Sequence, residues 1–169
     1  MATERDHTKH AVYAAELQVR STMERFRHDT HATVDFFGST LTVVPERIFA
    51  TLDEMKSYVN DVIEKWNSHR NTRHTVPHVR ERKSAELAHY EYDTKVIAIP
   101  TKVDWAMREL VVLHEVAHHI AMSFDTRAPH GPEFAATYVE LVSLIMGNEA
   151  GLLLRAAFDG QQVRVGIAR

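Results

Sequence analysis

The sequence predicts an α+β fold, because helical segments stand towards both ends of the chain and a group of short strand-like segments stands between them. Apolar residues recur at helical spacing from residue 9 onward and again over the last third of the chain, whereas residues 79–100 show short apolar runs separated by turn residues. A length of 169 residues suits one domain with a sizeable core, so we expect a single domain over residues 1–169.

Five helices are expected from this periodicity: residues 9–26, 51–66, 105–124, 130–146 and 149–158. Thr51 and Glu54 match a capping box at the start of the second helix. Asp104 is a candidate cap for the third helix. Apolar residues stand on both sides of the motif in this helix, which indicates that the helix is buried. Pro132 suits the first turn of the fourth helix, and Gly147 follows its last turn.

Five strands are expected: residues 33–37, 40–44, 79–83, 85–92 and 95–100. Gly38 and Ser39 form a candidate two-residue turn that would join the first two strands as a hairpin. The last three strands suggest a meander, and the continuous apolar run of residues 96–99 indicates burial on both faces. Basic residues gather around residues 70–83, which favours a solvated edge strand protected by charge over a contact for an acidic partner.

The composition excludes several classes of protein. A net charge of -3 gives no electrostatic reason to expect nucleic acid or an anionic membrane as a partner. The chain has no cysteine, so disulfides, thiolate metal sites and cysteine nucleophiles are excluded, and any zinc would need nitrogen and oxygen ligands. No apolar stretch reaches transmembrane length and residues 1–10 lack a signal-peptide core, so the expected location is the cytoplasm.

The most informative motif is His114-Glu115-Val116-Ala117-His118, which reads H-E-x-x-H inside the third predicted helix. Residues four apart on a helix share one face with a rise of about 6 Å, so His114 and His118 can bind one zinc ion together. Glu115 is then placed to act on a metal-bound water. The competing interpretation is a pair of hydrogen-bonded core histidines, but burying two histidines and a glutamate is costly unless they are paired or bind a metal. The pattern therefore predicts a metal-dependent hydrolase.

A catalytic zinc usually has three protein ligands and one open position, so a third ligand is expected downstream. His130 is the leading candidate, because it follows a short loop and begins a helix that can fold back onto the motif helix. Glu133 and Glu140 are carboxylate alternatives, and Asp125 is a weaker one. His119 points about 100° away around the helix and is expected to be a packing residue, or a residue that supports a ligand, and not a ligand itself.

The motif and its surroundings resemble a known family. H-E-x-x-H followed by His130-Gly131-Pro132-Glu133-Phe134 resembles the SprT-like zinc metalloproteases over about residues 79–146. The segments 77–82, 108–119 and 130–138 look closer still to a bacterial family of uncharacterised metallohydrolases, and this likeness covers most of the chain. The resemblance implies a zincin-like fold, with a small antiparallel or mixed sheet beside the motif helix. It also implies one zinc ion per chain on His114, His118 and His130, with Glu115 as the catalytic base.

Within this fold we expect an N-terminal helix and hairpin region at 9–67, a catalytic core at 79–147 and a C-terminal helix at 149–158. The expected function is a zinc metallohydrolase that cleaves amide bonds of a peptide or protein, which binds as an added strand at 85–92 or 95–100. A second electrophile is often needed, and the candidates are Tyr138, Tyr90, Tyr92 and Arg80, although a core or surface role is favoured for each of them. The alternatives are a non-catalytic module that binds a protein or DNA partner, and a structural metal domain without an open position.

Carboxylates beside the ligand imidazoles are expected to orient them by hydrogen bonding to the ring nitrogens that do not bind the metal. The available carboxylates are Glu109, Asp104 and Glu140, and the sequence does not rank them.

Overall fold

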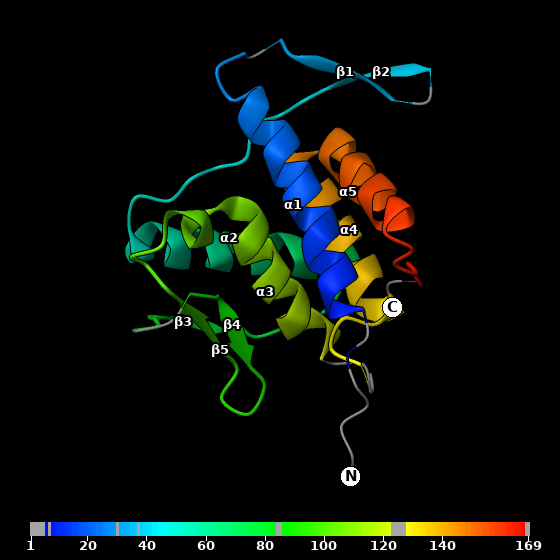
Figure 1. The fold of residues 1–169 in the computed structure, drawn as a ribbon. Coiled ribbons are helices and arrows are strands. Elements are labelled where there is room, and N and C mark those ends of the chain that lie inside the picture. Colours follow the sequence, from blue (N-terminus) through cyan, green and yellow to red (C-terminus); the bar gives the residue numbers. More distant parts are fainter. Residues whose placement is uncertain are drawn as a thin grey trace. The chain divides into compact units, whose positions relative to one another are not determined.

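The computed structural model describes residues 6, 8–29, 31–36, 38–83, 86–122 and 128–167. Over these residues the chain forms helices and two small sheets, so the predicted α+β class is confirmed (Figure 1). The chain divides into two compact units, Met1–Glu46 with Thr126–Arg169 as unit 1, and Arg47–Asp125 as unit 2. The single domain over 1–169, with its regions 9–67, 79–147 and 149–158, stays a prediction.

The described residues of unit 1 form three helices and a hairpin: α1 (Lys9–Arg25), α4 (Pro132–Met146), α5 (Asn148–Gly160), β1 (Thr33–Phe36) and β2 (Ser39–Thr42). α5 packs against both α1 and α4 (Figure 1). Gly147 separates α4 from α5 with φ of 106°, a left-handed conformation that favours glycine. The next glycine, Gly151, allows a close helix contact, because a Cβ there would lie 1.8 Å from Ser143 Oγ.

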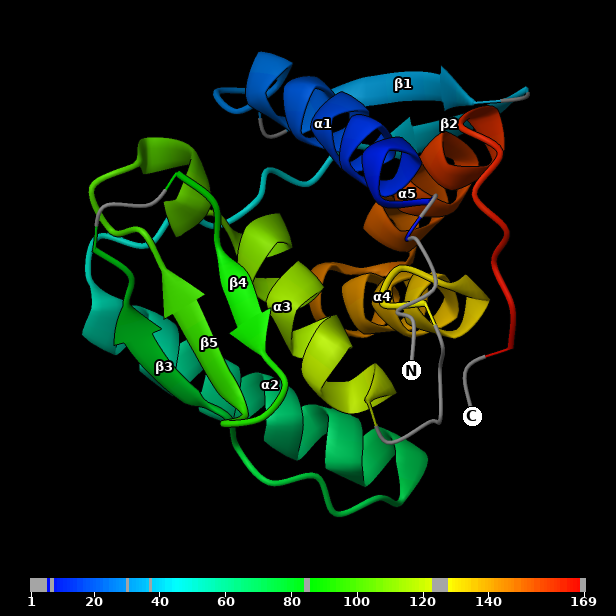
Figure 2. The ribbon, with the colours of Figure 1, turned by 60° about the horizontal axis from the view of Figure 1, so that its bottom comes forward.

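Unit 2 contains the motif helix, a longer helix and a three-stranded sheet: α2 (Leu52–Arg70), β3 (His78–Glu81), β4 (His89–Glu91), β5 (Val96–Ile99), the short 3₁₀ helix η1 (Asp104–Met107) and α3 (Glu109–Ala121). α2 contacts β3 and α3 contacts β4, so the two helices support the two outer strands (Figure 2). The predicted capping box is present at α2, where the backbone N–H of Glu54 donates to Thr51 Oγ1 at 3.2 Å.

The predicted meander is wrong. The sheet order is β3-β5-β4, with β3 parallel to β5 and β4 antiparallel to it. The central position of β5 in the sheet explains the apolar run of residues 96–99, because Ile97, Ala98 and Ile99 are completely buried. β3 and β4 are the two edge strands among the described residues, which agrees with the charged edge expected around residue 80.

The start of the motif helix also differs from the prediction. Asp104 lies at the start of η1, and α3 begins at Glu109 with Arg108 as its N-cap, so Asp104 does not cap it. The Glu109 carboxylate accepts the backbone N–H of Arg47 at 2.8 Å and the Tyr58 hydroxyl at 2.6 Å. This carboxylate ties the first turn of α3 to α2 and to the segment that precedes it, and so fixes the helix that carries the motif.

Among the described residues, no helix has both the length and the apolar character needed to cross a membrane.

Candidate metal centre

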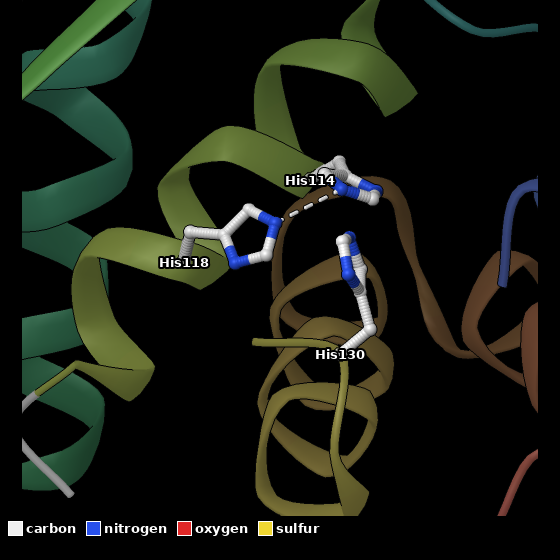
Figure 3. Close-up of side chains that lie close together, drawn as sticks. All are labelled: His114, His118 and His130. Atoms are coloured by element: carbon white, nitrogen blue, oxygen red, sulfur yellow. Dashed lines mark hydrogen bonds between the residues drawn. The ribbon is translucent and has the colours of Figure 1, made fainter. Parts of the chain in front are cut away.

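α3 presents the two histidines of the motif on one face, as their spacing predicts. His114 is 2% exposed and His118 is 6% exposed, and their Nε2 atoms lie 3.2 Å apart (Figure 3). Two nitrogens on a tetrahedral zinc ion, with Zn–N bonds of about 2.0–2.1 Å, are separated by about 3.3 to 3.4 Å. The observed separation therefore fits a shared metal ion.

His130 completes a buried group of three histidines that could hold a metal ion. Each of His114, His118 and His130 offers one ring nitrogen, and these atoms lie within 4.8 Å of one another (Figure 3). Three neutral nitrogen donors without a thiolate are typical of a zinc site that keeps an open position. The group does not include Glu133 or Glu140, which are described residues, and Asp125 lies outside the described part of the chain.

Tyr92 holds the second histidine of the motif. It lies in the turn after β4, and its hydroxyl is 2.9 Å from His118 Nδ1. If Nδ1 carries the proton and donates to this hydroxyl, Nε2 keeps its lone pair and faces His114. This tautomer is the one that a metal ion needs.

His119 has a separate environment, as expected for a packing residue. The carbonyl of Thr75 lies 2.7 Å from His119 Nε2 and can only accept, so Nε2 carries the proton. The remaining nitrogen, Nδ1, then accepts from the Tyr90 hydroxyl at 2.9 Å. Burial lowers the pKa of His119 and raises the pKa of Tyr90 to about 12, so both groups are neutral near pH 7.

Glu115 lies on α3 next to the first ligand candidate and is 4% exposed. A carboxylate that is removed from water to this extent is costly to ionise unless other groups interact with it. A carboxylate buried beside a metal site has the chemistry of a general base, because it is close to the ion and sheltered from bulk water.

Of the four auxiliary candidates, Tyr92 contacts His118, and the other three have other contacts. Tyr138 is fully buried in unit 1, where its ring packs against Phe134 and Phe158 at centroid distances of 5.8 and 6.2 Å. Tyr90 directs its hydroxyl to His119 and to Met122 Sδ. Their roles as electrophiles stay predictions.

Arg80, the third candidate, forms an ion pair with Glu91 between the two edge strands of the sheet. Its side chain is 44% exposed. These contacts account for Arg80 as a surface residue of the sheet.

The structure also shows a contact to His130 that the sequence did not suggest. Asp6 Oδ2 lies 2.5 Å from His130 Nδ1, although the two residues are 124 positions apart. Of the carboxylates that were expected in this role, Glu109 is engaged at the start of α3 instead. No local pattern around Asp6 signals its partner, because the contact joins the segment before α1 to the segment before α4, which is distant in sequence.

Comparison of the chain with protein-family models, with curated protein sequences and with solved structures finds no match. The resemblance to the SprT-like metalloproteases therefore rests on the motif residues alone.

Proposed function

We propose that this chain is a zinc-dependent hydrolase that cleaves amide bonds in peptides or proteins. One observation carries the proposal: three buried histidines, two of them from an H-E-x-x-H motif, offer ring nitrogens within 4.8 Å of one another. An acidic side chain of the same motif, Glu115, is buried next to the first of them. In this proposal His114, His118 and His130 hold the ion and Glu115 is not a ligand.

The donor set favours zinc. Imidazole nitrogens also suit nickel, cobalt, copper and iron, but a three-histidine set with no carboxylate or thiolate is a common arrangement for catalytic zinc. A zinc ion held there supplies Lewis acidity, which polarises a carbonyl group and lowers the pKa of water. The protein supplies the orientation of the imidazoles, through partners such as Tyr92, and the proton acceptor.

Glu115 performs the proton transfers in this mechanism. Its carboxylate accepts the proton of the attacking water and later delivers that proton to the nitrogen of the departing amine. Both transfers need a carboxylate close to the reacting atoms and shielded from solvent, and the burial of Glu115 supports this role.

Edge strand β4 supports a peptide as the substrate. It contacts α3, and its second edge has no strand partner among the described residues. An extended peptide can add to such an edge through main-chain hydrogen bonds, which places it alongside the motif helix. β5, the other strand expected in this role, is central in the sheet and has no open edge. Methylating alternate backbone nitrogens of a cleaved peptide is expected to abolish cleavage if this binding mode operates.

The test uses the zinc-loaded full chain with a library of quenched fluorescent peptides. Wild type is compared with Glu115→Gln and with Glu64→Gln, an exposed glutamate on α2 that serves as the matched control. We expect cleavage by wild type and the control, and a loss of about 10²- to 10⁴-fold in Glu115→Gln with its zinc retained. Cleavage by Glu115→Gln at the wild-type rate would remove Glu115 from the mechanism. Zinc binding without cleavage of any library peptide would instead favour the non-catalytic binding module.

A further inference from the structure

The side chain of His130 is held by the segment that leads into α1. Asp6 Oδ2 lies 2.5 Å from His130 Nδ1, and the side chains of Asp6 and His130 are only 18% and 6% exposed. The ring of Tyr13, in the first turns of α1, packs edge-on against the His130 ring at 5.6 Å. The imidazole is therefore fixed both by a hydrogen bond and by packing.

The backbone of His130 is held by the same segment. The Thr8 hydroxyl lies 2.7 Å from the carbonyl oxygen of His130 and 3.2 Å from Asp6 Oδ1. Thr8 is the N-cap residue of α1, yet its side chain makes no capping hydrogen bond to that helix. Its hydroxyl instead donates a hydrogen bond to the backbone of the turn that carries His130.

The chemistry of this contact determines which nitrogen of His130 can bind a metal. An ionised carboxylate only accepts hydrogen bonds, so Nδ1 carries the proton and Nε2 keeps its lone pair. A carboxylate on the far side of an imidazole also makes that imidazole a stronger donor to a metal. Asp6 is the described carboxylate seen in this position, whereas His118 has the neutral hydroxyl of Tyr92 at its Nδ1.

We propose that Asp6 is a positioning residue for the metal centre. It fixes His130 in its metal-binding tautomer and orientation and strengthens it as a ligand. Thr8 stabilises this arrangement through its contacts with both residues. This inference rests on the proposed function, since it concerns a ligand of the same site. It makes a residue at the start of the chain a determinant of metal affinity, although the residue touches neither the metal nor the substrate.

The test measures zinc affinity of the full chain by competition with a chromophoric chelator. The variants are Asp6→Ala, Asp6→Asn and, as a matched control, Asp61→Ala on the exposed side of α2. We expect Asp6→Ala to weaken zinc binding on the order of 10- to 100-fold, and Asp61→Ala to leave it unchanged. Asp6→Asn is expected to lose less, because its amide oxygen still accepts from Nδ1–H while the charge is gone.

A second readout separates positioning from a purely structural role. The unfolding midpoint of each variant is measured without metal and with excess zinc. Positioning predicts that Asp6→Ala loses more stability relative to wild type with excess zinc than without metal, because the gain from zinc follows the affinity. An equal loss with and without metal would assign Asp6 to folding alone and overturn the proposal.

The outcomes also distinguish this inference from the proposed function. Wild-type zinc affinity in Asp6→Ala, together with weakened binding in His130→Ala, would overturn the role of Asp6 and leave the metal centre intact. No zinc binding by wild type would overturn both.

Discussion

The hydroxyl of Tyr58 holds the start of the motif helix, and its removal gives a defined loss of stability. It donates at 2.6 Å to Glu109 Oε1, and Glu109 is only 8% exposed. Burial, followed by the negative charge of Glu109, raises the pKa of Tyr58 well above its ordinary value, so the hydroxyl stays protonated and remains a donor. Tyr58→Phe would leave one oxygen of a buried carboxylate without this donor.

The magnitude follows from the charge of the acceptor. A hydrogen bond to an ionised group contributes about 1.5 to 3 kcal/mol to the free energy of unfolding. In a chain of this size each kcal/mol lowers the melting temperature by about 2 to 4 °C, so Tyr58→Phe is expected to melt about 3 to 12 °C below wild type.

The assays are thermal and urea denaturation of metal-free protein, both followed by circular dichroism. Glu64→Gln is the control, because it changes an exposed side chain on the same helix, α2. A double-mutant cycle with Glu109→Gln measures the coupling between the two groups. A loss of less than about 0.5 kcal/mol in Tyr58→Phe, the size of an ordinary surface substitution, would refute the reasoning.

Three further predictions concern the metal site, the helix contact in unit 1 and pH. Tyr92→Phe is expected to weaken zinc binding about 10-fold in a chelator competition, because His118 Nδ1 loses its partner, and unchanged affinity would contradict this. Gly151→Ala is expected to destabilise the fold by about 1 to 3 kcal/mol in a urea titration, since its Cβ would meet Ser143 Oγ at 1.8 Å. Gly160→Ala is the control, because a Cβ there has nothing within 4 Å, and its stability should stay close to that of wild type. Burial lowers the pKa of His74 below its ordinary value of 6.5, so His74 binds a proton more readily in the unfolded chain than in the folded one. The contribution of neutral His74 to the free energy of unfolding is therefore present above pH 6.5 and is lost as the pH falls. Unfolding of metal-free His74→Gln should therefore depend less on pH below 6.5 than that of wild type, and identical profiles would rule this out.

Local patterns in the sequence predict the helices well. Apolar spacing and the Thr51–Glu54 capping box place α2, and Pro132 places the start of α4. The motif helix α3 is shorter than predicted, because residues 104–107 form a 3₁₀ helix. Its start is fixed by contacts of Glu109 with Arg47 and Tyr58, which are distant in sequence. Periodicity does not carry that information.

Sheet order and the surroundings of the site depend on contacts between distant residues. The apolar run of β5 indicates burial on both faces, but it does not say which strands lie on either side. In the same way, the motif identifies His114 and His118, while the choice of His130 over Glu133 or Glu140 needs three-dimensional placement. Asp6 could not be found from its neighbours at all, since its partner is 124 residues away.

The metal content of the protein tests the central claim most directly. Wild type, His130→Ala and Glu115→Gln are purified in parallel without an affinity tag or added metal, and the metal bound per chain is measured by mass spectrometry. We expect about one zinc ion per chain in wild type, a reduced amount in His130→Ala and an unchanged amount in Glu115→Gln, as a three-ligand site with a non-ligand base requires. If wild type holds no transition metal and takes up none on titration, the three histidines are hydrogen-bonded core residues and the account of a metal centre is wrong.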